Sequence, residues 1–246
     1  MINDNANNLV IDVGNTLTKL AVFKGNELVK EDKVGSVCLQ DIQQMVSDYK
    51  VKNAIISSVA TIPTDCHDYL ESNVSLVQFT STMPMPIKNL YKTPQTLGPD
   101  RVAAAVAANM LYPNSNVLVV DSGTALTYDV ITANAEYLGG AISLGISMRF
   151  KALNTFTSKL PLLNITNNYP IIGSSTNDSI LSGVLNGVVN EVDAYIGAIK
   201  REYHQLKIVF TGGDAFFFDK KLKNSIFVHP NLVLIGLNRI LNYYNE

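Results

Sequence analysis

Short apolar runs separated by polar turns fill the first part of the chain. Runs at residues 9–11 and 20–23 flank a turn that contains Gly14 and predict a β-hairpin, and a third strand is expected from Leu28. The pattern then alternates, with helices predicted over residues 39–49 and 63–72 and strands over residues 52–58 and 74–79. This succession of strands and helices is typical of an α/β fold.

The second half of the chain follows a proline-rich segment. Prolines at residues 83–94 favour extended backbone, and an alanine-rich helix is predicted after them over residues 102–111. A β-rich run at 116–120 comes next, followed by a long helical stretch at 176–203, a strand at 208–210, and helices near 214–222 and 231–244. We therefore predict a polar tail at residues 1–8 and two domains, residues 9–112 and 113–246.

The chain contains an internal echo. The strand that ends in Asp12-Val13-Gly14 resembles the strand that ends in Asp121-Ser122-Gly123, and each is followed by a threonine and a second apolar strand. Two similar α/β domains, each presenting an Asp-x-Gly hairpin, explain this match economically. A chance similarity between two valine-rich strands is the alternative.

Composition narrows the class of protein. The chain has 246 residues, 47% of them hydrophobic, and a net charge of −2, which excludes a disordered chain and gives no basic field for nucleic acid. No apolar run approaches the roughly 18 residues that span a bilayer, and the polar N-terminus does not resemble a signal peptide. The two cysteines, Cys38 and Cys66, form no metal or redox motif. We predict a soluble cytoplasmic protein without nucleic-acid or membrane partners.

The first hairpin carries groups suited to phosphate. Gly14 lets backbone N–H groups approach an anion closely, Asn15 and Thr16 add donors, and Lys19 adds a positive charge. Asp12 would repel a phosphate unless a divalent cation lay between them, and this combination suits Mg²⁺–nucleotide chemistry. The alternative is a hairpin whose polar side chains satisfy only local backbone groups.

Two further turns have the same character. Asp121-Ser122-Gly123-Thr124 repeats the hairpin motif, and Gly212-Gly213 follows a strand, where a backbone could pass close to a ribose or a base. The P-loop, the Rossmann fingerprint and the serine nucleophile elbow are absent from the sequence.

Asp100 opens the alanine-rich helix after Gly98-Pro99, and Arg101 follows it. The residues alone favour a capping carboxylate that stabilises the helix N-terminus. The functional alternative is a carboxylate base, with Arg101 gripping an anionic substrate.

Taken together, these motifs resemble those of the type III pantothenate kinases, within the superfamily of actin, heat-shock ATPases and sugar kinases. The resemblance covers about residues 8–240. Its motifs, in order, are Asp12-x-Gly14-Asn15-Thr16-x-x-Lys19, Gly98-x-Asp100-Arg101, Asp121-x-Gly123-Thr124-Ala125-x-Thr127, Gly139-Gly140-x-Ile142, Leu160-Pro161 and Gly173-x-x-Thr176.

The resemblance implies two ribonuclease-H-like domains with a nucleotide cleft between them, and ATP-dependent phosphorylation of pantothenate as the first step towards coenzyme A. It implies that Asp100 is the catalytic base, and that Asp12 handles Mg²⁺. The implied pantothenate site comprises Tyr91, Gly98, Asp100, Arg101 and Thr176. The implied nucleotide site comprises Asp12, Gly14, Asn15, Thr16, Lys19, Thr124, Gly212 and Gly213.

The resemblance also implies a monovalent cation, K⁺ or NH₄⁺, on Asp121 and a homodimer, for which the 176–203 stretch is an interface candidate. The chain departs from the family pattern at Leu144, where Pro-Gly is usual, and this change is expected to loosen the loop. A second departure, Pro99, is expected to stiffen the approach to Asp100. Two alternatives stay open: a kinase for another small hydroxylated acid or sugar, and a nucleotide-binding regulator without turnover.

Overall fold

The chain divides into two compact units. The computed structural model describes residues 6–14, 17–58 and 62–246. One unit consists of Met1–Leu111, Ala135–Tyr137 and Leu232–Glu246, and the other of Tyr112–Asn134 and Leu138–Asn231. The expected limits, 9–112 and 113–246, differ from this division at the C-terminus. The terminal helix belongs to the first unit because it packs against a helix and two strands of that unit.

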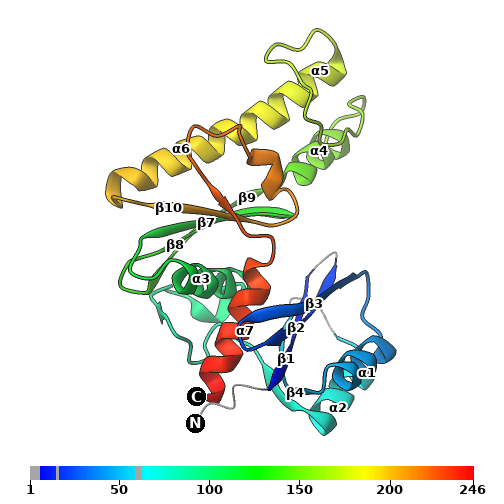
Figure 1. Ribbon diagram of the computed structural model, residues 1–246. Helices are drawn as coiled ribbons and strands as arrows, with labels where there is room; N and C mark the ends of the chain where they lie inside the picture. Colours follow the sequence, from blue (N-terminus) through cyan, green and yellow to red (C-terminus); the bar gives the residue numbers. More distant parts are fainter. Residues whose placement is uncertain (1–5, 15–16, 59–61) are drawn as a thin grey trace. The chain divides into compact units, whose positions relative to one another are not determined.

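The first unit is built on a five-stranded sheet with the order β3-β2-β1-β4-β5 (Figure 1). Its strands are β1 (Asn7–Val13), β2 (Thr18–Lys24), β3 (Glu27–Val34), β4 (Val51–Ser58) and β5 (Ser75–Gln78). β1 is antiparallel to β2 and parallel to β4. The predicted hairpin is therefore confirmed, and β4 returns beside its first strand.

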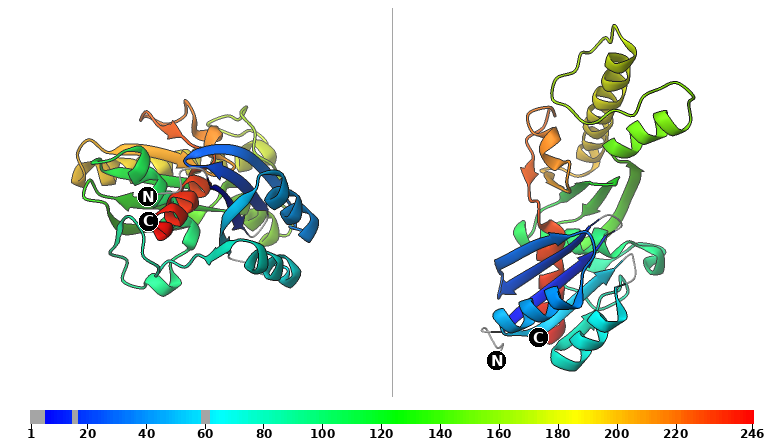
Figure 2. Two further views of the ribbon diagram at one scale, coloured as in Figure 1. Left: turned by 60° about the horizontal axis from the view of Figure 1, so that its bottom comes forward. Right: turned by 90° about the vertical axis from the view of Figure 1, so that its right-hand side faces the viewer.

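Helices cover both faces of this sheet. Its helices are α1 (Leu39–Asp48), α2 (Thr64–Asn73), α3 (Pro99–Leu111) and α7 (Leu232–Asn245). The views in Figure 2 show α1 and α2 on one side of the sheet and α7 on the other. Alternate residues of β1 explain the two layers, because Leu9 and Ile11 pack with Ile42 of α1 and Leu70 of α2. On the α7 side, the Asn8 side chain donates hydrogen bonds to Asn238 and Asn242 at 2.9 and 2.7 Å.

The second sheet repeats the plan of the first. Its order is β11-β10-β7-β8-β9-β6, so strands one to five of the repeat, β7 to β11, occupy the same relative places as β1 to β5. The strands are β6 (Lys88–Asn89), β7 (Val117–Ser122), β8 (Ala125–Ile131), β9 (Glu136–Leu144), β10 (Lys207–Thr211) and β11 (Phe227–Val228). β7 is antiparallel to β8 and parallel to β10. The internal echo in the sequence thus reflects a repeated topology.

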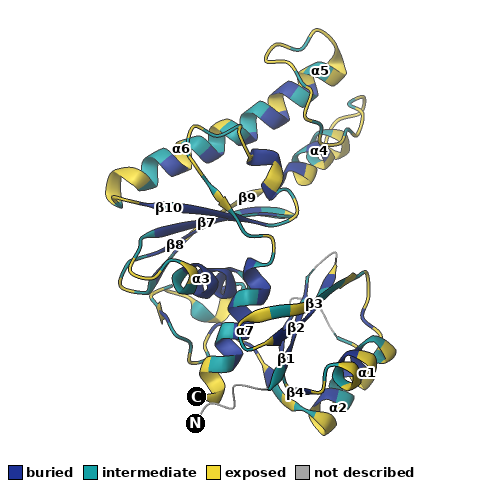
Figure 3. Cartoon of the chain, in the orientation of Figure 1, coloured by how far each residue is buried: buried dark blue, intermediate teal, exposed yellow. Residues whose placement is uncertain are grey.

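One long helical stretch covers the second sheet. It consists of α5 (Thr176–Leu181), a π-helical turn (Ser182–Asn186) and α6 (Gly187–Glu202), which matches the predicted stretch at 176–203. Val188, Val192 and Ile196 recur at helical spacing on α6 and pack in one core with strands β7 and β8 (Figure 3).

Two local predictions differ from the structure. A helix was expected near 214–222, but only a short 3₁₀ turn forms over Ala215–Phe218, where two phenylalanines are buried. Strand β9 and helix α4 (Ile146–Thr155) were not predicted. Across the described part of the chain, every helix is too short or too polar to span a bilayer.

Candidate active site

The first hairpin places Asp12 and Lys19 side by side. They are direct partners in the antiparallel pair β1–β2, so their side chains project from the same face of the sheet. The Gly14 N–H donates to the Leu17 carbonyl oxygen at 3.1 Å and closes the turn. The predicted phosphate residues Asn15 and Thr16 lie outside the described residues.

The electrostatics of Asp12 are unusual for an aspartate. Burial raises its pKa to about 6, with the Lys19 ammonium lowering it and the Asp100 carboxylate raising it. Asp12, Lys19 and Asp100 therefore act on one another within the first unit. A carboxylate whose charge is disfavoured by burial and by a second carboxylate gains from a nearby cation, which fits the expected Mg²⁺.

The start of α3 gathers the predicted pantothenate residues. Asp100 lies in the first turn, and its Oδ1 lies 2.5 Å from the position of a Cβ at Gly98, so a side chain at residue 98 would shift the Asp100 carboxylate. Arg101 is buried, and its guanidinium carbon lies 5.8 Å from the ring centroid of Tyr91. The Tyr91 ring in turn lies 6.2 Å from that of Tyr137. Tyr91, Gly98, Asp100 and Arg101 thus form one cluster.

The second hairpin and the Gly212 turn meet at Asp121. Asp121 pairs with Thr127 on β8 and with Thr211 on β10. Gly212 has a φ of +92°, and a Cβ there would collide with Asp121 Oδ1 and with the Ser122 carbonyl oxygen. The structure therefore brings Asp121 and the Gly212 turn together, which the motifs did not predict. Thr124 and Gly213 are exposed at the ends of these turns.

Thr176 belongs to the second unit. It is exposed at the start of α5, whose N-cap Ser175 accepts a hydrogen bond from the Asp178 N–H at 3.1 Å. It lines a cavity of about 990 Å³ together with Arg149, Leu153, Ile180 and neighbouring residues. Asp121 is not among the lining residues, so this cavity does not join Thr176 to the expected cation residue.

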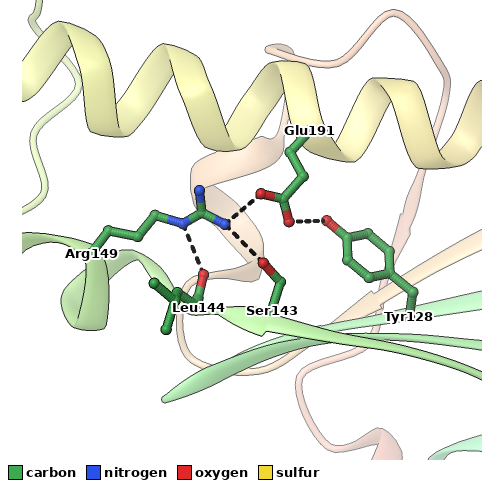
Figure 4. Close-up of polar contacts among 5 residues, drawn as sticks. All are labelled: Tyr128, Ser143, Leu144, Arg149 and Glu191. Carbon is green, nitrogen blue, oxygen red and sulfur yellow. Dashed lines mark hydrogen bonds and ion pairs between the residues drawn. The ribbon is translucent and has the colours of Figure 1, made fainter. Parts of the chain in front are cut away.

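Sequence reasoning missed a polar network behind this cavity (Figure 4). Arg149 donates from Nε to the Leu144 carbonyl oxygen at 2.9 Å and from Nη2 to Glu191 Oε2 at 2.6 Å. The Tyr128 hydroxyl donates to Glu191 Oε1 at 3.1 Å, and burial raises the pKa of Tyr128. No motif contained Tyr128, Arg149 or Glu191, because Glu191 lies 63 and 42 residues from its partners Tyr128 and Arg149.

The segment without its usual proline is held by this network and by close packing. A Cβ at Gly145 would collide with the carbonyl oxygens of Gly123 and Thr124. The N-terminus of α4 therefore rests directly on the Asp121-x-Gly123 turn. Instead of the loose loop expected at Leu144, the structure has a strand end whose carbonyl is bonded to Arg149.

Two hydroxyl groups near Asp121 also escaped the sequence analysis. Ser122 Oγ and Thr127 Oγ1 are buried and make no hydrogen bond in the described part of the molecule. Thr127 belongs to the motif Asp121-x-Gly123-Thr124-Ala125-x-Thr127, which offered no role for its side chain.

Comparison with known proteins decides the family. The model of the type III pantothenate kinase family matches residues 8–198. A type III pantothenate kinase from Phocaeicola vulgatus is 46% identical over 97% of this chain and 99% of its own. One from Cytophaga hutchinsonii is 44% identical over 96% of this chain and 99% of its own. The chain belongs to the type III pantothenate kinase family.

Solved structures share the fold of this chain. A conserved Campylobacter jejuni protein described as a putative Baf family transcriptional activator matches 96% of this chain and 98% of its own, with a TM-score of 0.63 at 22% identity. The ROK hexokinase of Thermus thermophilus matches 98% of this chain and its whole length, with a TM-score of 0.51 at 10% identity. At such identities the likeness concerns the fold alone, and it confirms the predicted α/β fold class of actin-like ATPases and sugar kinases.

Proposed function

We infer that this protein transfers the terminal phosphoryl group of ATP to the primary hydroxyl of pantothenate, giving 4′-phosphopantothenate, the first step of coenzyme A synthesis. Family membership supports this activity. The observation that carries it is the group formed by Asp12, Lys19 and Asp100 beside the buried Arg101. Phosphoryl transfer requires positioning and charge neutralisation more than covalent chemistry, and these residues can supply both.

The pantothenate end of the site is the cluster at the start of α3. Asp100 is the base that accepts the hydroxyl proton, and its place in the first helical turn fixes its direction. Arg101 pairs with the pantothenate carboxylate, because a guanidinium suits a planar anion. Tyr91 packs near Arg101, and its ring supplies one wall. Thr176 adds a hydroxyl from α5.

The phosphate end of the site is the first hairpin. Gly14, Asn15, Thr16 and Lys19 contact the phosphates, and Asp12 holds Mg²⁺ directly or through water. When bound, Mg²⁺ neutralises charge on the phosphate oxygens. Burial disfavours the ionised form of the Asp12 carboxylate. A bound cation stabilises that ionised form, so the buried position of Asp12 favours cation binding.

The second hairpin serves the nucleotide and a monovalent cation. Asp121 binds K⁺ or NH₄⁺, and Thr124, Gly212 and Gly213 face the nucleotide. A side chain at Gly212 would collide with Asp121 Oδ1. Glycine therefore places backbone, and no side chain, beside the proposed nucleotide and cation site.

We also propose that the active form is a homodimer. Large apolar side chains stand exposed around the cavity that contains Thr176: Phe156 and Ile172 are each 85% exposed, and Ile171 is 78% exposed. Such a patch is typical of a covered surface, and a second copy of this chain is the partner that the family resemblance implies.

The test is a coupled assay that measures ADP release with pantothenate, ATP, Mg²⁺ and K⁺, omitting each in turn. We expect turnover only in the complete mixture. Turnover with a sugar or another hydroxy acid, but not with pantothenate, would favour a different kinase on the same fold. Nucleotide binding by calorimetry without ADP formation from any acceptor would favour a regulatory protein.

A further inference from the structure

The repeated topology gives each residue of the first hairpin a counterpart in the second. Asp12 and Asp121 each precede the last residue of the first strand of their repeat, β1 and β7. Across the hairpin, Lys19 is the direct partner of Asp12, and Thr127 is the direct partner of Asp121. The partner of the aspartate is therefore a lysine with an ammonium group in the first unit and a threonine with a hydroxyl group in the second.

The Thr127 side chain lies on the same face of the sheet as that of Asp121. Direct partners in an antiparallel pair project from the same face, with their Cβ atoms roughly 4.5–5.5 Å apart. Thr127 Oγ1 is buried and has no hydrogen-bond partner among the described residues. A buried hydroxyl without a partner is unfavourable, and in native proteins it calls for an explanation such as a bound ion.

The neighbouring strand completes a row of oxygen atoms. Thr211 pairs with Asp121 from the other side, and among the described residues its hydroxyl has one long hydrogen bond of 3.5 Å, to the Pro230 carbonyl oxygen. The backbone of Gly212 packs directly against the Asp121 side chain, because a Cβ there would collide with Asp121 Oδ1. Carboxylate and hydroxyl oxygens are the ligands that hard cations prefer over nitrogen and sulfur ligands.

We propose that Thr127 is a direct ligand of the monovalent cation that Asp121 binds, through Oγ1. This inference rests on the cation site of the proposed function. The bound cation then supplies in the second hairpin the positive charge that Lys19 supplies in the first. The orphaned hydroxyl gains its partner only when the ion is present.

Thr127→Val tests this role, because valine keeps the shape of threonine and removes the oxygen. Ser122→Ala is the matched control. Ser122 Oγ is also buried without a partner, but strand alternation directs it to the opposite face from Asp121. Melting temperatures are measured in the presence of Mg²⁺–ADP, first in a K⁺ buffer and in a tetramethylammonium buffer of equal ionic strength. The melting temperature is then followed as K⁺ replaces tetramethylammonium stepwise. Thr127→Ser is a second control that retains the oxygen.

We expect the K⁺ concentration that gives half of the maximal rise in melting temperature to be at least about tenfold higher for Thr127→Val than for the wild type. This is the size of effect expected when a metal site loses one contact. In tetramethylammonium, Thr127→Val should melt at or above the wild-type temperature, because an unpartnered buried hydroxyl has been removed. Thr127→Ser and Ser122→Ala should stay within about threefold of the wild-type K⁺ requirement. If the valine variant does not fold, Thr127→Ala gives the same comparison.

Two results separate failure of the inference from failure of the cation site. If the wild-type melting temperature and turnover do not respond to K⁺, the cation site itself is wrong. If the wild type responds and Thr127→Val or Thr127→Ala responds at the same K⁺ concentration, Thr127 is not a ligand. An equal loss in Ser122→Ala would also overturn the inference, because a general disturbance of the hairpin would then explain the effect.

Discussion

At the scale of single residues, the proposed chemistry assigns different roles to carboxylates whose surroundings differ. Asp100 stands in the first turn of α3 with its side chain over Gly98. Asp100→Asn keeps this shape but removes the base, so we expect normal folding and a fall in kcat of about 10²-fold or more. Steady-state kinetics and circular dichroism check both parts. A kcat near the wild-type value would refute the base assignment.

Asp12 predicts a pH dependence of stability. Its pKa is about 6 in the fold and 3.8 for an aspartate exposed to water, so the folded state holds the proton over a pH range in which the unfolded state has released it. The resulting stabilisation is present below pH 4 and is lost as the pH rises through 6, by up to about 3 kcal/mol. Asp12→Asn should lack this loss. Denaturant unfolding from pH 4 to pH 8 without metal or nucleotide measures it.

The control for this pH profile is Asp48→Asn, which removes an exposed carboxylate at the end of α1. It should keep the wild-type slope. A wild-type slope in Asp12→Asn would show that another group causes the dependence.

Short local motifs mark Asp12, Asp100 and Asp121 as candidates in the sequence, and their roles stay predictions. The contacts of Arg149 and Glu191, and the lack of a hydrogen-bond partner for Thr127 Oγ1 among the described residues, could not be predicted from such motifs. Glu191 meets Arg149 and Tyr128 only after a helix has folded over a sheet, and the unpartnered state of Thr127 is visible only once its strand is buried. Such contacts depend on tertiary packing and leave no spacing pattern in the chain.

At the scale of secondary-structure elements, the Arg149–Glu191 pair joins α4 to α6. Its side chains are 18% and 25% exposed, and Glu191 also accepts the Tyr128 hydrogen bond. Glu191→Ala leaves a guanidinium and a hydroxyl half-buried without this partner, so we expect a loss of about 2–3 kcal/mol in the free energy of unfolding. Urea unfolding measures this loss.

The exposed pair Lys30–Asp32 is the control, because both side chains are about 40% exposed. Asp32→Ala should change stability by less than about 1 kcal/mol. In the double variant Glu191→Ala with Arg149→Met, part of the loss should be recovered, since no unpaired charge remains. Additive losses would mean that the two side chains do not depend on each other.

Most elements follow from hydrophobic periodicity, and the exceptions have physical causes. The run of phenylalanines after Gly213 has the apolar content of a helix, yet Lys220 adopts a φ of +62°, which ends any helical course. Strand β9 contains two glycines, which weaken its β-signal.

At the scale of the whole molecule, the exposed apolar patch predicts the oligomeric state. Ile172→Asp should convert a dimer into a monomer, because a carboxylate would be buried without a partner at the interface. Analytical ultracentrifugation measures the mass. Tyr244→Asp, at an exposed site on α7, should leave the dimer intact. A wild-type monomer at micromolar concentration would contradict the proposal.

The place of α7 has a consequence for biosynthesis. β1 of the first unit precedes the second unit in the chain, but α7, which covers one face of β1, follows it. Asn8 of β1 is bonded to Asn238 of α7, so this contact forms only after every residue of the second unit has been synthesised. The unit that is begun first therefore completes its fold only after the other unit has been made.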